Sequence, residues 1–201
     1  MRRRTFIDRV ARLGVAAVAL TAPAAIRTAL AGPAVAQGLF IHDSPRPLPG
    51  LDIKDADGKP APLPAGKAAV LNLWASWCLP CVAELPALDR LKPQADALGV
   101  AVIALSLDRM GASAARQAFG RIGITTLDIR VDDTRRAAEV LAAPVLPTTI
   151  LVDREGREAA RFIGPAAWDS PPALALVRAL AAGKTLSPDM APPLVKAGMA
   201  P

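Results

Sequence analysis

Only two cysteines occur among the 201 residues, and they lie at Cys78 and Cys81, separated by two residues. The apolar run 69–73 precedes them and predicts a buried strand, while residues 82–91 follow with leucines at helical spacing. The pair therefore lies where a strand passes into a helix. The free N–H groups and the positive dipole end of that helix lower the pKa of the first thiol. The second thiol follows on the same helical face, within reach of a disulfide, so the predicted chemistry is thiol–disulfide exchange.

The surrounding residues resemble the thioredoxin superfamily, and within it the TlpA/ResA-like extracytoplasmic thioredoxins. The resemblance is carried by the strand and active-site signature of 70–81, by the Cys-x-x-Cys-x-x-Glu-x-Pro pattern of 78–86, and by Leu146-Pro147-Thr148-Thr149, which is similar to the family's cis-proline loop. It covers residues 48–183. It implies an α/β, thioredoxin-like fold: a central mixed β-sheet flanked by helices, with an N-terminal hairpin and a central helix–strand insert.

The resemblance also implies residue roles. Cys78 attacks a partner disulfide as a thiolate, and Cys81 resolves the mixed disulfide. Asn72 replaces the buried aspartate of thioredoxins proper, which implies that Glu84 takes over as the base for Cys81. A proline inside the pair accompanies a low potential in reducing thioredoxins, so a reductant is favoured over an oxidant. The implied substrate-binding surface comprises Trp77, Leu79, Pro80, Leu146 and Pro147.

Three other readings of the cysteine pair carry less weight. A structural disulfide across two residues closes so small a loop that it restricts the unfolded chain little. A thiol peroxidase requires a Pro-x-x-x-Thr-x-x-Cys pattern, which is absent from the sequence. A dithiol metallochaperone that delivers copper is the main alternative, because thiolates favour Cu(I), but no methionine or histidine cluster accompanies the pair. We predict no cofactor and no metal site.

The net charge of +6 is concentrated at the N-terminus. Residues 1–36 hold six arginines and one aspartate, so the remainder is close to neutral and nucleic-acid binding is not predicted. A cationic start, the apolar stretch 13–26 and Ala34-Val35-Ala36 predict a signal peptide over 1–36 that is cleaved after Ala36. Arg3-Arg4 resembles a twin-arginine signal, and an uncleaved membrane anchor is the alternative. The leader predicts a periplasmic protein.

The remaining chain is divided into a linker over 37–50, a thioredoxin-like domain over 51–183 and a loosely ordered tail over 184–201. His42 is expected to be solvated in the linker, and Trp168 is expected to be a packing residue. Expected partners are protein disulfides, with apo-cytochrome c or a copper-site protein as candidates, and a membrane thiol reductase as electron donor; the chain is expected to be a monomer. Strands are predicted at 69–74, 100–106, 127–131, 149–152 and 159–163 with a hairpin at 51–63, and helices at 78–97, 112–121, 134–141, which Thr134 caps, and 171–182.

Overall fold

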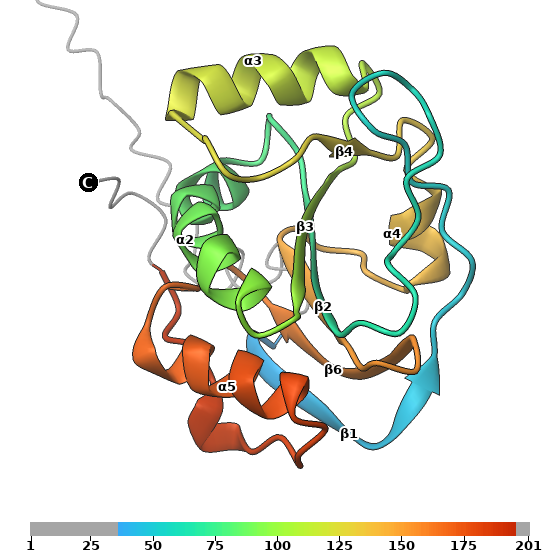
Figure 1. Ribbon diagram of the computed structural model, residues 1–201. Helices are drawn as coiled ribbons and strands as arrows, with labels where there is room; N and C mark the ends of the chain where they lie inside the picture. The colour runs from blue at the N-terminus through green and yellow to red at the C-terminus, as the bar shows by residue number, and fades with distance from the viewer. Residues whose placement is uncertain (1–35, 196–201) are drawn as a thin grey trace, which may run out of the picture. The chain divides into compact units, whose positions relative to one another are not determined.

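The computed structural model describes residues 36–195, so the predicted signal peptide lies outside the described residues except for Ala36. One mixed sheet holds six strands in the order β1-β6-β5-β2-β3-β4 (Figure 1). The strands are β1 (Gly38–Pro47), β2 (Ala69–Trp74), β3 (Ala101–Ser106), β4 (Arg130–Val131), β5 (Thr148–Val152) and β6 (Arg157–Ile163). The helices are α2 (Leu79–Asp96), α3 (Ala112–Ile122), α4 (Arg136–Val140), α5 (Pro171–Ala181) and the 3-10 helix η1 (Pro188–Met190).

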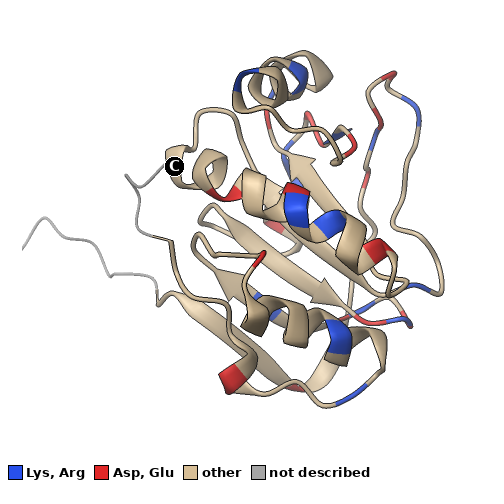
Figure 2. Ribbon diagram, turned by 60° about the vertical axis from the view of Figure 1, so that its left-hand side comes forward, with Lys and Arg blue, Asp and Glu red and all other residues tan. Residues whose placement is uncertain are grey.

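The centre of the sheet is apolar on both faces. Strand β2 is fully buried and pairs parallel with β3 and antiparallel with β5. Its alternate side chains enter two different cores: Val70 and Trp74 pack toward α2, α3 and α5, whereas Leu71 and Leu73 pack toward α4. Figure 1 shows α2 and α5 on one side of the sheet and α4 on the other. Figure 2 shows that charged residues are concentrated in helices and loops and are sparse in the strands.

These features confirm the predicted thioredoxin-like α/β fold. The predicted strand 127–131 is shorter than expected, since only Arg130–Val131 pairs with β3. The predicted hairpin at 51–63 is reduced to a turn closed by one bridge between Lys54 and Pro60. No helix among residues 36–195 combines the length and the apolar character needed to cross a membrane.

The predicted linker over 37–50 is wrong, because most of it forms β1. This strand pairs antiparallel with β6, first over 38–41 and again at 46–47 after an irregularity. Leu39 and Ile41 pack against the core. Prolines do not prevent the pairing, because β1 is an edge strand. A proline lacks an N–H, and on the outer side of an edge strand no partner strand would accept from it. His42 is consequently not solvated: its Nε2 lies 2.7 Å from Glu158 Oε1, and its side chain is 9% exposed.

The predicted loose tail is also wrong for the part that the structure describes. Leu186 is buried, and η1 follows it. The backbone then runs beside the loop that precedes α5, where Ala167 N–H donates to the Pro193 carbonyl at 2.9 Å and Val195 N–H donates to the Pro165 carbonyl at 2.9 Å. The ordered domain therefore extends at both ends beyond the predicted 51–183, from β1 to residue 195.

The predicted N-cap of α4 is Thr134, but the N-cap residue in the structure is Arg135. Arg135 has a left-handed backbone with φ of 64°. The buried Asp132 does most of the capping, because its carboxylate accepts from Ala137 N–H at 2.6 Å and from Thr134 N–H at 3.0 Å. Among the described residues, the Thr134 hydroxyl accepts only from Arg136 N–H, at 3.3 Å. The cap is therefore supplied from outside the helix, by the residue that follows β4.

Candidate active site

The two cysteines form a disulfide at the N-terminus of α2, with an S–S distance of 2.07 Å. Cys78 is the N-cap, and its sulfur accepts a hydrogen bond from the Cys81 N–H at 3.3 Å. Because Leu79 and Pro80 occupy the first positions of the helix, the cysteines fall on one helical face. Cys78 is 7% exposed and Cys81 is fully buried, so the first sulfur is the more accessible one.

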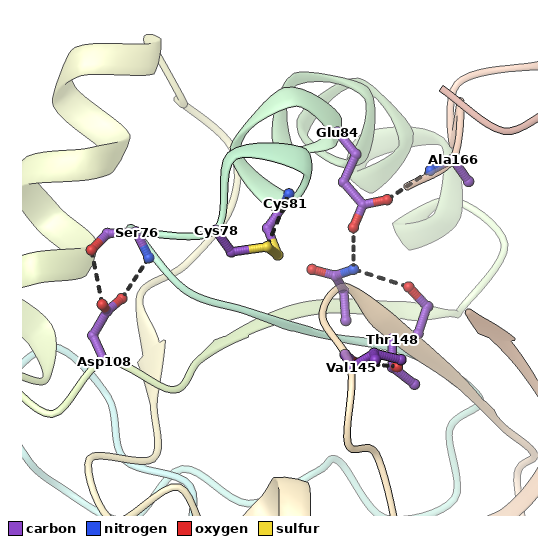
Figure 3. Close-up of a disulfide and its surroundings, with 10 residues drawn as sticks. Ser76, Cys78, Cys81, Glu84, Asp108, Val145, Thr148 and Ala166 are labelled. Carbon is purple, nitrogen blue, oxygen red and sulfur yellow. Dashed lines mark hydrogen bonds between the residues drawn. A yellow bond between two sulfur atoms is a disulfide. The ribbon is translucent and has the colours of Figure 1, made fainter. Parts of the chain in front are cut away.

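The loop before Cys78 is held by a buried carboxylate. Asp108 follows β3 and accepts from the Ser76 N–H at 2.9 Å and from the Ser76 hydroxyl at 2.8 Å (Figure 3). The Ser106 hydroxyl donates to the same carboxylate at 2.8 Å. Cys78 N–H adds a bond to the Ala75 carbonyl at 3.1 Å. The turn that presents the disulfide is therefore fixed by the end of the neighbouring strand.

A groove of about 1010 Å³ borders the disulfide. Four of the five residues predicted to bind substrate line it, namely Trp77, Leu79, Pro80 and Leu146, together with Cys78. Trp77 is 59% exposed and Leu79 is 78% exposed, an arrangement that leaves two large apolar side chains in water next to the reactive sulfur. The opposite wall comes from α4 and the segment after it, including Arg135, Glu139 and Ala142.

The fifth predicted residue, Pro147, is buried and lies behind the groove rather than on its wall. The Leu146–Pro147 peptide bond is cis, as the resemblance implied. Two hydrogen bonds fix the loop: the Thr148 hydroxyl donates to the Val145 carbonyl at 2.7 Å, and Gly164 N–H donates to the Pro147 carbonyl at 3.0 Å. No backbone hydrogen bond to Leu146 is found among the described residues.

Glu84 lies one turn beyond Cys81 and is fully buried. Its carboxylate accepts from Ala166 N–H at 2.9 Å (Figure 3). It also accepts from Asn72 Nδ2 at 2.7 Å and from Trp168 Nε1 at 3.1 Å. Burial raises the pKa of Glu84 to about 8, and these three neutral donors offset only part of that effect. Neither cysteine is among its hydrogen-bond partners in this disulfide form. Asn72 also donates to Thr149 Oγ1 at 2.9 Å, which ties Glu84 to the strand after the cis proline.

Three residues of the site have roles that the sequence did not predict. Trp168 does pack in the core, but its indole N–H also binds Glu84. Asp108 and Arg135 gave no local signal, because each reaches the active-site loop from another strand or helix. The only available hint for Asp108 was its position at the end of a buried strand, where side chains gather beside the end of a parallel neighbour.

Another buried carboxylate, that of Glu158, supports the wall made by α4. Glu158 on β6 accepts from Arg161 Nε at 2.6 Å and lies 2.7 Å from Nε2 of His42. Arg161 in turn donates to the Leu141 and Ala142 carbonyls at 3.1 Å each, at the C-terminal end of α4. Burial raises the pKa of Glu158, but the hydrogen bonds and charges of Arg161 and His42 outweigh it and the net shift is downward.

The mixed sheet, the disulfide at a helix N-terminus and the adjoining apolar groove define a thioredoxin-like thiol–disulfide oxidoreductase. The chain belongs to the AhpC/TSA family, whose model matches residues 46–161. It is 30% identical over 118 residues to thiol-disulfide oxidoreductase ResA of Bacillus anthracis, which covers 58% of this chain and 67% of that protein. It is 32% identical over 111 residues to the thioredoxin-like protein YneN of Bacillus subtilis, covering 54% of this chain and 64% of that protein.

Solved structures agree with this assignment. A thiol-disulfide oxidoreductase from Bacteroides fragilis superposes with a TM-score of 0.53 at 26% identity, over 59% of this chain and 90% of that one. A protein from Chlorobium tepidum described as a putative thiol:disulfide interchange protein DsbE has a TM-score of 0.56 at 23% identity, over 63% and 89% of the two chains. The second likeness supports the fold alone.

Proposed function

We propose that this chain is an exported oxidoreductase that reduces disulfides in periplasmic partner proteins through a Cys78–Cys81 dithiol. The observation that carries the proposal is the placement of Cys78, which caps α2, receives an N–H from its own helix and borders the apolar groove. An N–H and a helix dipole aimed at a sulfur atom stabilise its thiolate. The buried Cys81 is then the cysteine that resolves the mixed disulfide.

Electrons and protons balance in two steps. The Cys78 thiolate attacks one sulfur of the partner disulfide, that bond breaks, and the released partner thiolate takes up a proton. Glu84 in its ionised form takes the proton of Cys81, and the Cys81 thiolate attacks Cys78. The bond between Cys78 and the partner breaks, the second partner sulfur leaves as a thiolate and takes up the proton that Glu84 holds, and the Cys78–Cys81 disulfide closes. A pKa of about 8 for Glu84 lets this carboxyl take up and release a proton near neutral pH. A membrane thiol reductase then restores the dithiol.

The groove suits an extended polypeptide. Leu146 offers a backbone N–H and carbonyl without partners in the described chain, and a strand-like segment can pair with them. Trp77 and Leu79 give the same segment apolar contacts. Apo-cytochrome c and a copper-site protein are the partners that the family resemblance suggests. The leader suggests export to the periplasm, and we propose a monomer.

The experiment compares Cys81→Ser with Cys78→Ser in the leader-free domain. Cys81→Ser leaves the attacker without its resolver, so it accumulates mixed disulfides with partners and with disulfide-containing probes such as insulin, visible on non-reducing gels. Cys78→Ser accumulates none. The wild-type dithiol reduces insulin, whereas both variants do not turn over. Trapping by Cys78→Ser alone would reverse the two roles, and a wild type that never reduces a protein disulfide would refute the proposal.

Copper delivery through the same dithiol is the alternative left by the sequence. Residues 36–195 contain no group of three or more His, Cys, Asp or Glu side chains arranged to hold a metal ion. Adding Cu(I) to the reduced domain and measuring bound metal separates the two functions. Copper bound one to one and transferred to an apo-protein, without insulin reduction, would favour the metallochaperone.

A further inference from the structure

A second groove adjoins the first on the other side of Trp77. It has a volume of about 540 Å³ and lies between the active-site loop, the loop after β3 and the start of α3. Trp77 and Arg135 line both grooves, so this pair forms a ridge between them. The floor of the second groove includes Ser76 and Asp108, which Figure 3 shows joined beside the disulfide, and its rim includes Met110, which is 78% exposed.

Arg135 is held in place on this ridge. Its backbone is left-handed, a conformation that disfavours a side chain with a Cβ, and such residues persist where their surroundings fix them. Its N–H donates to the Asp132 carbonyl at 3.2 Å, and the Asp132 carboxylate fixes the turn on either side. The guanidinium carbon lies 5.4 Å from the centroid of the Trp77 ring. This distance is within the range of a cation–π contact, and no hydrogen bond or ion pair from the guanidinium to another side chain is found in the described part of the chain.

The two grooves differ in charge. The first contains Glu139 as well as Arg135. The second is lined by Arg135 and Arg109, and its one carboxylate, Asp108, is buried and already accepts from two serines. Neither arginine forms a salt bridge with a carboxylate in the described part of the chain. A planar guanidinium with free in-plane donors matches a carboxylate.

We propose that the two grooves form one docking surface for an extended polypeptide that carries an acidic side chain beside its reactive cysteine. The cysteine lies over Cys78 in the first groove, and the acidic side chain crosses the ridge and binds Arg135, with Arg109 behind it. Arg135 is thus a specificity-determining residue. This inference rests on the proposed reduction of protein disulfides and adds the class of substrate that it favours.

The test uses synthetic peptides, each closed by one internal disulfide, that are identical except for Asp, Asn or Lys at one position next to the attacked cysteine. One set places the variable residue before that cysteine and another set places it after. Rate constants for reduction by the dithiol domain are measured at low and at high ionic strength. In one set, Asp should be reduced about three- to fivefold faster than Lys at low salt, within the range that one partly exposed charge pair supplies. High salt should shrink this preference.

Arg135→Gln should bring the Asp and Lys rates within about twofold of each other, and Arg135→Lys should keep part of the preference because it keeps the charge. Arg136→Gln is the matched control: it removes the same charge from the next residue, which is exposed and lines neither groove. It should leave the preference intact. The rate at which iodoacetamide alkylates Cys78, measured against pH, corrects for any change in the thiol itself.

The outcomes are distinguishable. Equal rates for the Asp and Lys peptides in both sets, with reduction still occurring, would overturn the docking surface and leave the proposed function in place. An equal loss of preference in Arg135→Gln and Arg136→Gln would overturn the role of Arg135, because general charge would then explain the effect. Failure to reduce any peptide would count against the proposed function itself.

Discussion

Glu84 and Glu158 are both buried carboxylates near the groove, yet their pKa values move in opposite directions. Burial raises the pKa of each. Glu84 has three neutral donors and no cation, and its pKa rises to about 8. Glu158 has Arg161 and His42 against it, and its net shift is downward. The difference shows that the partner, and not burial alone, decides which carboxylate holds a proton at neutral pH.

The two groups are therefore suited to different tasks. A carboxyl that exchanges a proton near pH 8 can serve the chemistry behind the disulfide. A carboxylate that stays ionised can hold Arg161, which in turn holds the Leu141 and Ala142 carbonyls just after α4. Asp89 refines the comparison. Burial raises its pKa, but donors from 125–127 outweigh that effect and the net shift is downward, so enough neutral donors can replace a cation.

The largest effect should come from Glu84→Gln, measured against pH. Between the ordinary pKa of 4.5 and the folded value of about 8, the folded protein keeps a proton that the unfolded chain releases. Stability from this group is thus fully present below pH 4.5 and is lost as pH rises to 8, by up to about 5 kcal/mol at 1.36 kcal/mol per unit. Urea unfolding from pH 5 to 8 should show about 3–4 kcal/mol of this fall in the wild type and none of it in Glu84→Gln.

Glu155→Gln is the matched control, because Glu155 is exposed and pairs only with Arg157 on the surface. It should leave the pH dependence of unfolding as in the wild type. If the wild type and Glu84→Gln gave parallel curves, Glu84 would be ionised in the folded state, and the contrast with Glu158 would disappear.

Removing the cation from Glu158 should have the next largest effect. Arg161→Met leaves a buried carboxylate without its charge partner, which costs about 3–5 kcal/mol. The free energy of urea unfolding at pH 7 measures the loss. Arg157→Met, at an exposed arginine on the same strand, should cost no more than about 1 kcal/mol. Adding Glu158→Gln to Arg161→Met should recover part of the stability, and an unchanged double variant would show that charge burial is not the cause.

The features predicted from the sequence depend on residues close together in the chain, whereas the features that were missed depend on residues far apart. Strand β2 and helix α2 are encoded by a continuous apolar run, a cap and helical leucines, so both were predicted with their bounds. The cysteines follow from the same signals. Strand β1 was missed because only its pairing with β6, more than a hundred residues later, makes a strand of a proline-rich segment.

The candidate site likewise has features that were predicted from nearby residues and features that depend on distant ones. Glu84 was named because the family resemblance implied its role, but its donors Ala166 and Trp168 lie 82 and 84 residues away. Its pKa is raised by burial and lowered in part by these donors, and neither effect can be read from the residues next to it. Arg135 was invisible because its position over Trp77 depends on a left-handed turn that the buried Asp132 fixes. Residue types near the cysteines were predictable, whereas the surfaces that select a partner were not.

The smallest expected effect concerns the second partner of Glu158. His42→Ala removes one hydrogen bond but leaves Arg161 in place, so the cost should be about 1–2 kcal/mol in the free energy of urea unfolding at pH 7. His42→Gln keeps a donor of similar reach and should recover part of that loss. Asp43→Ala, at the next residue and exposed, should be close to neutral. A neutral His42→Ala would mean that Arg161 alone sets the charge state of Glu158, and that β1 contributes to the fold only by its backbone pairing.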